Sequence, residues 1–354
     1  MRRYDLTRED LAGLVARLGE PAYRAGQLWD GLHADPSAPE PSALTNLPKA
    51  LRARLAEEPA LRPALALAHE SASEGGDTVK WLWTLDDGRQ VETVLMHYPD
   101  RSTVCISSQA GCAMGCGFCA TGQAGFDRHL SAGEIVEQVV RAARRAHEDG
   151  RRLSNVVFMG MGEPLANYDP TWGAIERLHA DVGLSARHLT VSTVGIVPGI
   201  RRLATEALPV NLAVSLHAAD DELRNELVPI NRRYPLSTLM DACAGYLLAK
   251  GRRLSFEWAL IDGVNDRPQD AQRLVERSRS LPLPAHVNLI PLNPTPGYAV
   301  RGSPARRVRE FRDELRAGGV NATVRRTRGT DIDAACGQLR ASHEVTLQVS
   351  ARGR

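Results

Sequence analysis

The chain has 354 residues, of which 43% are hydrophobic and 24% charged, as in a soluble globular protein with room for one large domain and an appendage. No apolar run is long enough to cross a bilayer, and the amino terminus enters charged residues without a signal-peptide core, so the sequence predicts a cytoplasmic protein without a membrane anchor. The net charge of +2 excludes a general polycation. All but three of the 44 basic residues are arginine, however, so the composition permits RNA binding without establishing it.

The first 60 residues predict three short amphipathic helices. Thr7 and Asp10 form a capping pattern at the start of the first helix, and Gly19 ends its apolar stripe. Pro21 would open the second helix, and the third would begin near Pro48. Three helices of this size bury little apolar surface alone, so we expect a small module that either docks RNA or a partner, or is a plain structural cap.

The next stretch predicts a linker and a β-hairpin. Alanine, proline and a Ser-Ala-Ser-Glu-Gly-Gly segment are typical of a linker, and the apolar runs that follow are typical of two strands joined by an Asp-Asp-Gly turn. On the second strand Glu92 shares a face with Val94 and Met96, where a carboxylate is ordinarily an edge charge or a salt-bridge partner. The expected ranges are 60–77 for the linker, Val79–Leu85 and Gln90–Met96 for the strands, and 86–88 for the turn.

Three of the six cysteines, Cys112, Cys116 and Cys119, lie in a Cys-x3-Cys-x2-Cys pattern among glycines that exclude a regular helix or strand. Three thiolates on so short a loop point at one centre, either zinc or iron–sulfur. A closed zinc site needs four ligands, and the chain offers no second pair. A four-iron cluster held by three cysteines keeps one iron open for a small ligand. The motif therefore predicts a [4Fe–4S] cluster in a reducing compartment, and the alternative is three thiols without a metal.

From residue 103 the sequence alternates between strand-like and helix-like segments. This alternation predicts parallel strands with helical crossovers that close fully or partly into a barrel. The expected strands are Thr103–Ser107, Ser154–Met159, His188–Ser192, Val210–Ser215, Leu254–Ile261, His286–Leu292 and Val320–Arg325. The expected helices are Ser131–His147, Pro170–Asp181, Pro198–Glu206, Leu236–Ala249, Pro268–Arg279 and Pro304–Ala317.

The cysteine motif, with Phe118 just before its last cysteine, resembles the signature of the radical S-adenosylmethionine (SAM) superfamily. The resemblance implies a [4Fe–4S] cluster whose open iron binds the amino and carboxylate groups of SAM, and whose reduced form cleaves SAM to a 5′-deoxyadenosyl radical. It also implies an α/β fold, a partial (βα)6 barrel, which agrees with the alternation above.

Polar residues follow several of the expected strands at their carboxyl ends, where parallel α/β folds gather their chemistry. Taken singly, each would be an ordinary capping or loop residue, but four such loops beside the cysteine motif predict a SAM-binding cradle. Glu163 suits the ammonium group of SAM, and the hydroxyl and amide groups suit its carboxylate and ribose. The predicted cofactor-binding residues are Gly162, Glu163, Ser192, Ser215, Leu216, His217 and Asn293.

The motifs together resemble the RlmN family of RNA adenine-C2 methyltransferases, which modify 23S rRNA and certain tRNAs. The resemblance covers most of the chain, including the helical module and the hairpin. It rests on the segments 160–164 (GMGEP), 192–195 (STVG), 215–218 (SLHA), 263–266 (GVND) and 331–339 (DIDAACGQL). The implied division is 1–60 as a helical accessory domain, 61–97 as linker and hairpin, 98–340 as the radical SAM core and 341–354 as a tail.

The RlmN resemblance implies a mechanism with two thiols. Cys336 accepts a methyl group from one SAM, and the radical made from a second SAM takes a hydrogen atom from that S-methyl group. The carbon radical then adds to C2 and attaches the RNA to Cys336. Loss of the C2 proton and attack by Cys105 free the product and leave a disulfide. The proton is removed by Glu92 or by Cys105, and a partly apolar strand would raise the pKa of Glu92 toward that of a base.

Three other functions stay open at this point. A resistance-type relative that methylates C8 of the same adenine would share the cysteines and the fold. A glycyl-radical activase would need neither Cys105 nor Cys336, and a non-catalytic iron–sulfur RNA-binding module would not consume SAM. The implied partners are 23S rRNA, tRNA and an electron donor such as flavodoxin or ferredoxin. Cys243, within a predicted helix, is expected to be a small core residue.

Overall fold

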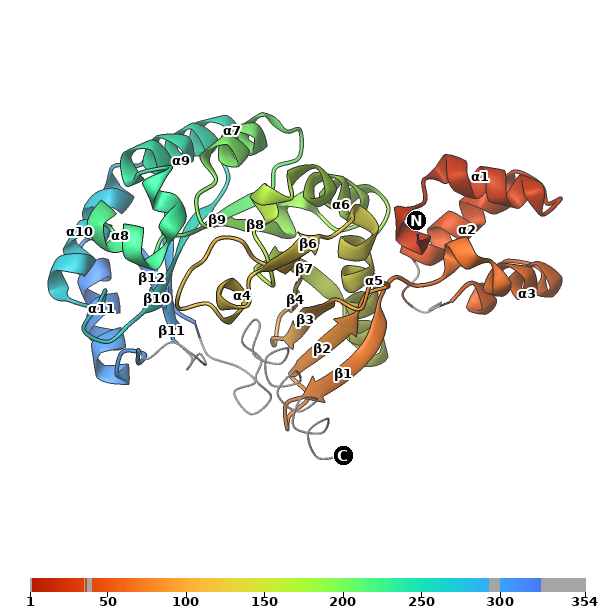
Figure 1. The fold of residues 1–354 in the computed structure, drawn as a ribbon, viewed down its shortest axis with the longest axis horizontal. Helices are drawn as coiled ribbons and strands as arrows, with labels where there is room; N and C mark the ends of the chain where they lie inside the picture. The colour runs from red at the N-terminus through yellow and green to blue at the C-terminus, as the bar shows by residue number, and fades with distance from the viewer. Residues whose placement is uncertain (1, 35, 37–39, 293–299, 326–354) are drawn as a thin grey trace.

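The computed structural model describes residues 2–34, 36, 40–292 and 300–325. A helical module lies to one side of the sheet (Figure 1) and consists of α1 (Arg8–Arg17), α2 (Tyr23–His33) and α3 (Lys49–Glu57). Thr7 caps α1 as predicted, because its hydroxyl accepts a hydrogen bond from the Asp10 N–H at 3.1 Å. The module is joined to the next domain by Asp5, whose carboxylate accepts a hydrogen bond from the Gly133 N–H at 3.0 Å.

A curved ten-stranded sheet forms the body of the molecule, in the order β1-β2-β3-β4-β7-β8-β9-β10-β11-β12. The pairs from β1 to β4 are antiparallel, and every pair from β4 to β12 is parallel. Within the described residues β1 and β12 are the two edges and do not pair with each other, so the barrel is open. The strands are β1 (Ala66–Ala72), β2 (Thr78–Thr84), β3 (Gln90–His97), β4 (Ser102–Cys105), β7 (Leu153–Phe158), β8 (Leu189–Thr193), β9 (Asn211–Ser215), β10 (Leu254–Leu260), β11 (His286–Pro291) and β12 (Asn321–Val324).

Helices lie around the outside of the parallel part of the sheet (Figure 1), and each connects two parallel strands. The predicted partial (βα)6 barrel is therefore confirmed. Apolar side chains such as Val156, Val191, Phe256 and Trp258 fill the space between sheet and helices and are fully buried. The helices are α5 (Ala132–Glu148), α6 (Tyr168–Ala180), α7 (Val197–Thr205), α8 (Asp221–Leu227), α9 (Leu236–Lys250), α10 (Pro268–Arg279) and α11 (Ala305–Ala317).

The predicted linker at residues 60–77 is wrong in part, because β1 lies within it and pairs antiparallel with β2. The strand is almost wholly exposed, with Leu67 55% accessible, so no face of it needs apolar residues. Its sequence therefore lacks the alternation that marks a half-buried strand, and only its backbone pairing with β2 defines it. Among the described residues no helix is both long and apolar enough to span a membrane.

Candidate active site

The cysteine loop leaves the barrel after β4 and is flanked by a small antiparallel pair, β5 (Gln109–Gly111) and β6 (Phe126–His129), with the short helix α4 (Ala120–Gln123) between them. Cys112, Cys116 and Cys119 all line one cavity of about 190 Å³. Gly111 has φ +78°, and a Cβ there would lie 2.1 Å from the Gly125 carbonyl oxygen, so only glycine allows the loop to close.

The three cysteines fit an iron–sulfur cluster better than a single ion. No group of three His, Cys, Asp or Glu side chains in the described part of the chain is arranged to hold one metal ion. Each cysteine of a four-iron cluster binds a different iron, so the thiols need not meet at one point. Burial raises the pKa of the Cys112 thiol to about 12 and also raises the pKa of Cys116. Such thiols become thiolates only beside strong positive charge, which iron would supply.

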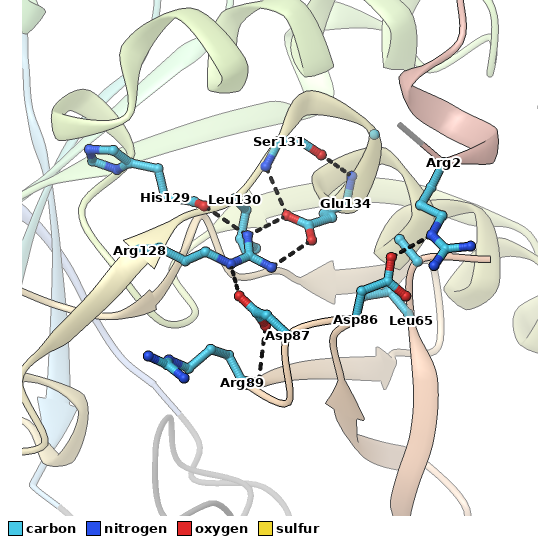
Figure 2. A network of polar contacts seen from close by, with 12 residues as sticks. Arg2, Leu65, Asp86, Asp87, Arg89, Arg128, His129, Leu130, Ser131 and Glu134 are labelled. Atoms are coloured by element: carbon cyan, nitrogen blue, oxygen red, sulfur yellow. Dashed lines mark hydrogen bonds and ion pairs between the residues drawn. The ribbon is translucent and has the colours of Figure 1, made fainter. Parts of the chain in front are cut away.

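An ion-pair network holds the far side of the cysteine loop (Figure 2). The Arg128 guanidinium, on β6, donates two hydrogen bonds of 2.8 Å to the Glu134 carboxylate at the start of α5 and a further one to Asp87 in the β2–β3 turn. The neighbouring Asp86 pairs with Arg2 of the amino-terminal segment. The Arg128 guanidinium holds the pKa of Asp87 below its usual value. The loop is thus fixed to the hairpin, to α5 and through them to the helical module.

The structure brings most of the residues predicted for a SAM cradle to one cavity. Gly162, Glu163, Ser192, Ser215 and His217 line the same 190 Å³ cavity as the three cysteines. Leu216 is fully buried and is absent from the cavity lining. Its backbone N–H donates a hydrogen bond to the Glu257 carbonyl of β10 at 3.0 Å. The predicted Asn293 lies outside the described residues.

Glu163 is held by backbone donors at the cavity wall. Its carboxylate accepts hydrogen bonds from the Leu165 N–H at 3.1 Å and the Val194 N–H at 2.8 Å. Burial nevertheless raises the pKa of Glu163 to about 7, because these two donors offset only part of the desolvation. The preceding Gly162 has φ +101°, and a Cβ there would lie 2.5 Å from the Gln109 Cβ. A side chain at residue 162 would therefore push the Glu163 turn away from the cavity.

His217 is the one non-glycine residue with positive φ (+59°) in the described part of the chain. Its Nδ1 accepts a hydrogen bond from the Ala259 N–H at 3.0 Å, and its carbonyl accepts one from the Asn265 side chain at 2.8 Å. Burial, and to a smaller extent the charge of Arg224, lowers the pKa of His217 to about 3. The imidazole is therefore neutral, and because Nδ1 is an acceptor, Nε2 carries the proton.

Arg224, which the sequence analysis missed, connects the loops after β8 and β9. This buried guanidinium donates to the Leu216 carbonyl at 3.0 Å, the Val194 carbonyl at 2.7 Å and the Ser215 carbonyl at 3.2 Å. Burial lowers the pKa of Arg224 to about 10, so it stays charged at neutral pH. No local pattern in the sequence distinguishes Arg224 from the many surface arginines.

Glu92 and Cys105 lie next to each other on the hairpin side of the barrel. The β3–β4 register places Cys105 opposite Val94, two residues from Glu92. The Lys80 Nζ lies 3.0 Å from the Glu92 Oε2, and both side chains are buried. Of the two ordinary roles expected for this carboxylate, the salt-bridge partner is the one observed, while Val94 and Met96 of the same face are buried in an apolar cluster. Burial raises the pKa of the Cys105 thiol, while the charges of Arg325 and Lys80 act in the opposite direction.

Cys105 connects this group to the cavity of the cysteine loop. It packs in one apolar cluster with Met96, Val157 and Met159, and Met159 also lines the 190 Å³ cavity. The five cysteines of the described residues are free thiols, so the structure does not support the predicted disulfide: Cys105 is reduced and lies in an apolar cluster, and Cys336 lies outside the described residues. Cys243 is a fully buried core residue, as predicted.

The comparisons with known proteins cover nearly the whole chain. A family model described as Ribosomal RNA large subunit methyltransferase N-terminal domain matches residues 4–60, and the Radical SAM superfamily model matches residues 106–275. A probable dual-specificity RNA methyltransferase RlmN from Chloroflexus aurantiacus is 51% identical, with 97% of this chain and 94% of the relative covered. The same description applies to a relative from Parafrankia sp. that is 53% identical, with 96% and 92% covered.

Among solved structures, a radical SAM methyltransferase from Sphaerobacter thermophilus matches with a TM-score of 0.89 and 50% identity, covering 96% of this chain and 98% of that one. These matches include the helical module, the hairpin and the barrel with its cysteine loop. The chain belongs to the RlmN family of RNA methyltransferases, within the radical SAM superfamily.

Proposed function

We propose that this chain methylates C2 of adenine in 23S rRNA and in tRNA, with SAM and a [4Fe–4S] cluster as cofactors and Cys336 as the methyl carrier. The supporting observation is that the cysteine loop and the buried thiol Cys105 both adjoin Met159 within one barrel. A cluster alone would need no second thiol. Family membership supports the assignment of RNA as the substrate.

Cys112, Cys116 and Cys119 would hold three irons of the cluster and leave the fourth free. Together, the cluster and SAM supply a 5′-deoxyadenosyl radical, which is the kind of reagent that a non-nucleophilic carbon such as adenine C2 requires. Phe118 lies edge-on to the neutral His217 at 4.7 Å between ring centroids, and both line the cavity. These two rings would limit the access of water to the radical.

SAM binding would use groups with defined charge and direction. The Glu163 carboxylate, ionised when a cation arrives, would accept the ammonium group of SAM. The neutral His217 would donate from Nε2, since its Nδ1 is already bonded to the Ala259 N–H. Ser192, Ser215 and Gly162 would line the rest of the cofactor site, together with Asn293, which lies outside the described residues.

Glu92 and Cys105 would complete the reaction on the RNA. After the carbon attached to Cys336 has joined C2, a base must take the C2 proton, and either Glu92 or Cys105 could do so. The Glu92 Oε2 lies 3.0 Å from the Lys80 Nζ, so the candidate base is held in a buried ion pair. Cys105 would then act on the sulfur of Cys336, so that the methylated RNA is released from the protein.

The test is a reaction of anaerobically purified, cluster-loaded protein with SAM, reductant and a 23S rRNA fragment. We expect 5′-deoxyadenosine release and 2-methyladenosine by mass spectrometry of the digested RNA. Cys119→Ala should lose both products, whereas Cys243→Ala, which changes a core cysteine on α9, should keep both. A product of 8-methyladenosine would refute the C2 assignment, and RNA binding without SAM cleavage would leave only an iron–sulfur RNA-binding module.

Two further variants separate the roles of the thiols. Cys336→Ala should abolish methylation while the cluster and SAM cleavage remain. Cys105→Ala should leave RNA covalently attached to the protein, because no thiol resolves the adduct. We also propose residues 1–60 as an RNA-docking unit, 98–340 as the catalytic core, a flavodoxin or ferredoxin as the electron donor and the cytoplasm as the location, where tRNA and ribosomes are available.

A further inference from the structure

The barrel contains a second and larger cavity, of about 1160 Å³, at the end opposite the cysteine loop. Its wall consists largely of residues in the first three positions of successive parallel strands and in the loops that precede them, so it opens at the amino ends of the strands. Single small-molecule sites usually occupy about 300 to 1,000 Å³, so a cavity of this size suits part of a larger ligand. The strand residues are Thr103, Asn155, Thr190, Asn211, Ser255, His286 and Asn321.

This opening carries an excess of positive charge. We call it the basal mouth and define it by Arg101, Arg187, Arg252, Arg253 and His286, all of which line the cavity. Among the residues that the structure describes, the cavity lining includes two carboxylates. Asp100 pairs with Arg101 at 3.1 Å, and Glu257 is buried and bonded to Ser255 and Asn288.

Arg187, Arg252 and Arg253 form no ion pair with any residue that the structure describes. Arg187 and Arg253 are exposed, whereas Arg252 is half-buried and donates to the Asn211 side chain at 3.1 Å. Three arginines that converge on a concave surface, outside any ion pair with a described residue, concentrate a positive field there. They therefore favour a polyanion over a neutral or cationic ligand.

Two buried polar atoms at the basal mouth have no partner in the structure: His286 Nδ1 and Arg252 Nε. His286 is 8% exposed, and its Nε2 lies 2.9 Å from both the Asn288 Oδ1 and the Thr323 Oγ1. Burial, and then the nearby Arg253, lowers the pKa of His286, so the ring is neutral. With Nε2 donating to Asn288, Nδ1 is an acceptor that has no hydrogen-bond partner among the described residues.

The basal mouth is continuous with the reaction centre. Met159, Glu257 and Arg325 line both this cavity and the 190 Å³ cavity of the cysteine loop. The strand β4 advances about 10 Å from Ser102, near the basal mouth, to Cys105. A nucleotide whose phosphate is held at the basal mouth is long enough to span this distance. On the hairpin side, Tyr98 lines the cavity beneath the Arg101 guanidinium, 4.3 Å from the ring centroid, and presents an aromatic surface near the opening.

We propose that the basal mouth binds the RNA backbone: Arg187, Arg252 and Arg253 hold phosphates beside the target adenosine, and the unstacked adenosine extends through the lumen toward Cys105. This inference rests on the proposed function, because it takes the RNA substrate from there. It adds the side of the barrel from which the RNA enters and the residues that hold it. The RNA would thus enter from the end opposite the cluster.

The experiment measures RNA binding directly, and steady-state methylation gives a second readout. A fluorescent RNA hairpin that contains the target adenosine is titrated with cluster-loaded protein over a series of salt concentrations. The test variant is Arg187→Gln/Arg253→Gln, since neither side chain has a partner whose loss would disturb the fold. The matched control is Arg201→Gln, an exposed arginine on the outer helix α7. SAM cleavage in the absence of RNA reports that each variant is folded.

The double variant should bind RNA roughly tenfold more weakly, and its plot of log affinity against log salt should be shallower by about 1.4, or about 0.7 for each lost phosphate contact. Its KM for RNA should rise with kcat unchanged. Lysine at both positions should restore most of the affinity. An affinity and slope equal to those of the wild type, or an equal loss in the Arg201 control, would overturn the inference.

These outcomes also separate this inference from the proposed function. If the wild-type protein forms no methyladenosine while the Arg187→Gln/Arg253→Gln variant still loses RNA affinity, the proposed function alone is refuted. Normal methylation together with unchanged RNA binding in the double variant would sink the inference alone.

Discussion

The buried pair of Lys80 and Glu92 gives a quantitative test of the proposed reaction centre. At 3.0 Å and an effective dielectric constant of about 20, the attraction between the two charges is about 5 to 6 kcal/mol. Desolvation of two fully buried ions offsets most of this gain. The pair therefore contributes little net stability, but either charge left alone in the same site is strongly unfavourable.

The perturbation is a double-mutant cycle of Lys80→Met, Glu92→Leu and the combined variant. Each single substitution should lower the free energy of unfolding by about 3 to 5 kcal/mol, because it removes the opposite charge that lies against a buried ion. The combined variant should be within about 1 kcal/mol of the wild type or more stable, since two apolar side chains replace the pair. Lys49→Met, at an exposed position of α3, should change stability by less than about 0.5 kcal/mol.

The assay is urea unfolding of the cluster-loaded protein under anaerobic conditions, followed by circular dichroism. Midpoints are compared at matched slopes, because the slope reports the surface exposed on unfolding. Two results would refute the reasoning: single substitutions that lower stability by less than about 1 kcal/mol, or a combined variant that shows the sum of both losses. Either would mean that the two charges do not depend on each other.

Three further predictions concern the SAM cavity. SAM affinity should fall by up to tenfold per pH unit below about pH 7, because Glu163 must release its proton to accept an ammonium group. Equilibrium dialysis should show this fall for the wild type and a flat pH profile for Glu163→Gln. Gly162→Ala should weaken SAM binding and lower stability by about 1 to 3 kcal/mol, and normal binding would contradict the crowding against Gln109. Arg224→Met should lower the unfolding midpoint, because three carbonyl groups lose their donor.

The barrel could be predicted from the sequence because its elements carry strong periodic patterns. The strand β10 alternates apolar residues, Leu254, Phe256 and Trp258, with residues that face the barrel interior, and α5 begins with a Ser131 and Glu134 capping box. The cysteine loop was equally clear, since its spacing and glycines have no common alternative. In contrast, β1 was missed because an exposed edge strand needs no apolar face.

The details of the site were harder to predict because they depend on contacts distant in sequence. Lys80 meets Glu92 only because β2 and β3 pair in one register, which the turn at residues 86–88 determines. Arg224 reaches carbonyl groups up to 30 residues away. The arginines of the basal mouth come from three connections that are far apart in the chain. No local pattern separates such residues from solvated ones.

The two cavities explain how one barrel could hold two large ligands. The 190 Å³ cavity beside the cysteine loop is confined by Glu163, His217 and Phe118, and leaves no room for a polymer. The open, arginine-lined cavity lies at the other end of the same strands. If each ligand enters from its own end, the reactive groups meet near Met159, which lines both cavities and packs on Cys105. Entry from opposite ends would keep the radical away from solvent. The target adenosine would reach into the lumen, while the rest of the RNA, which is too large to enclose, stays outside the barrel.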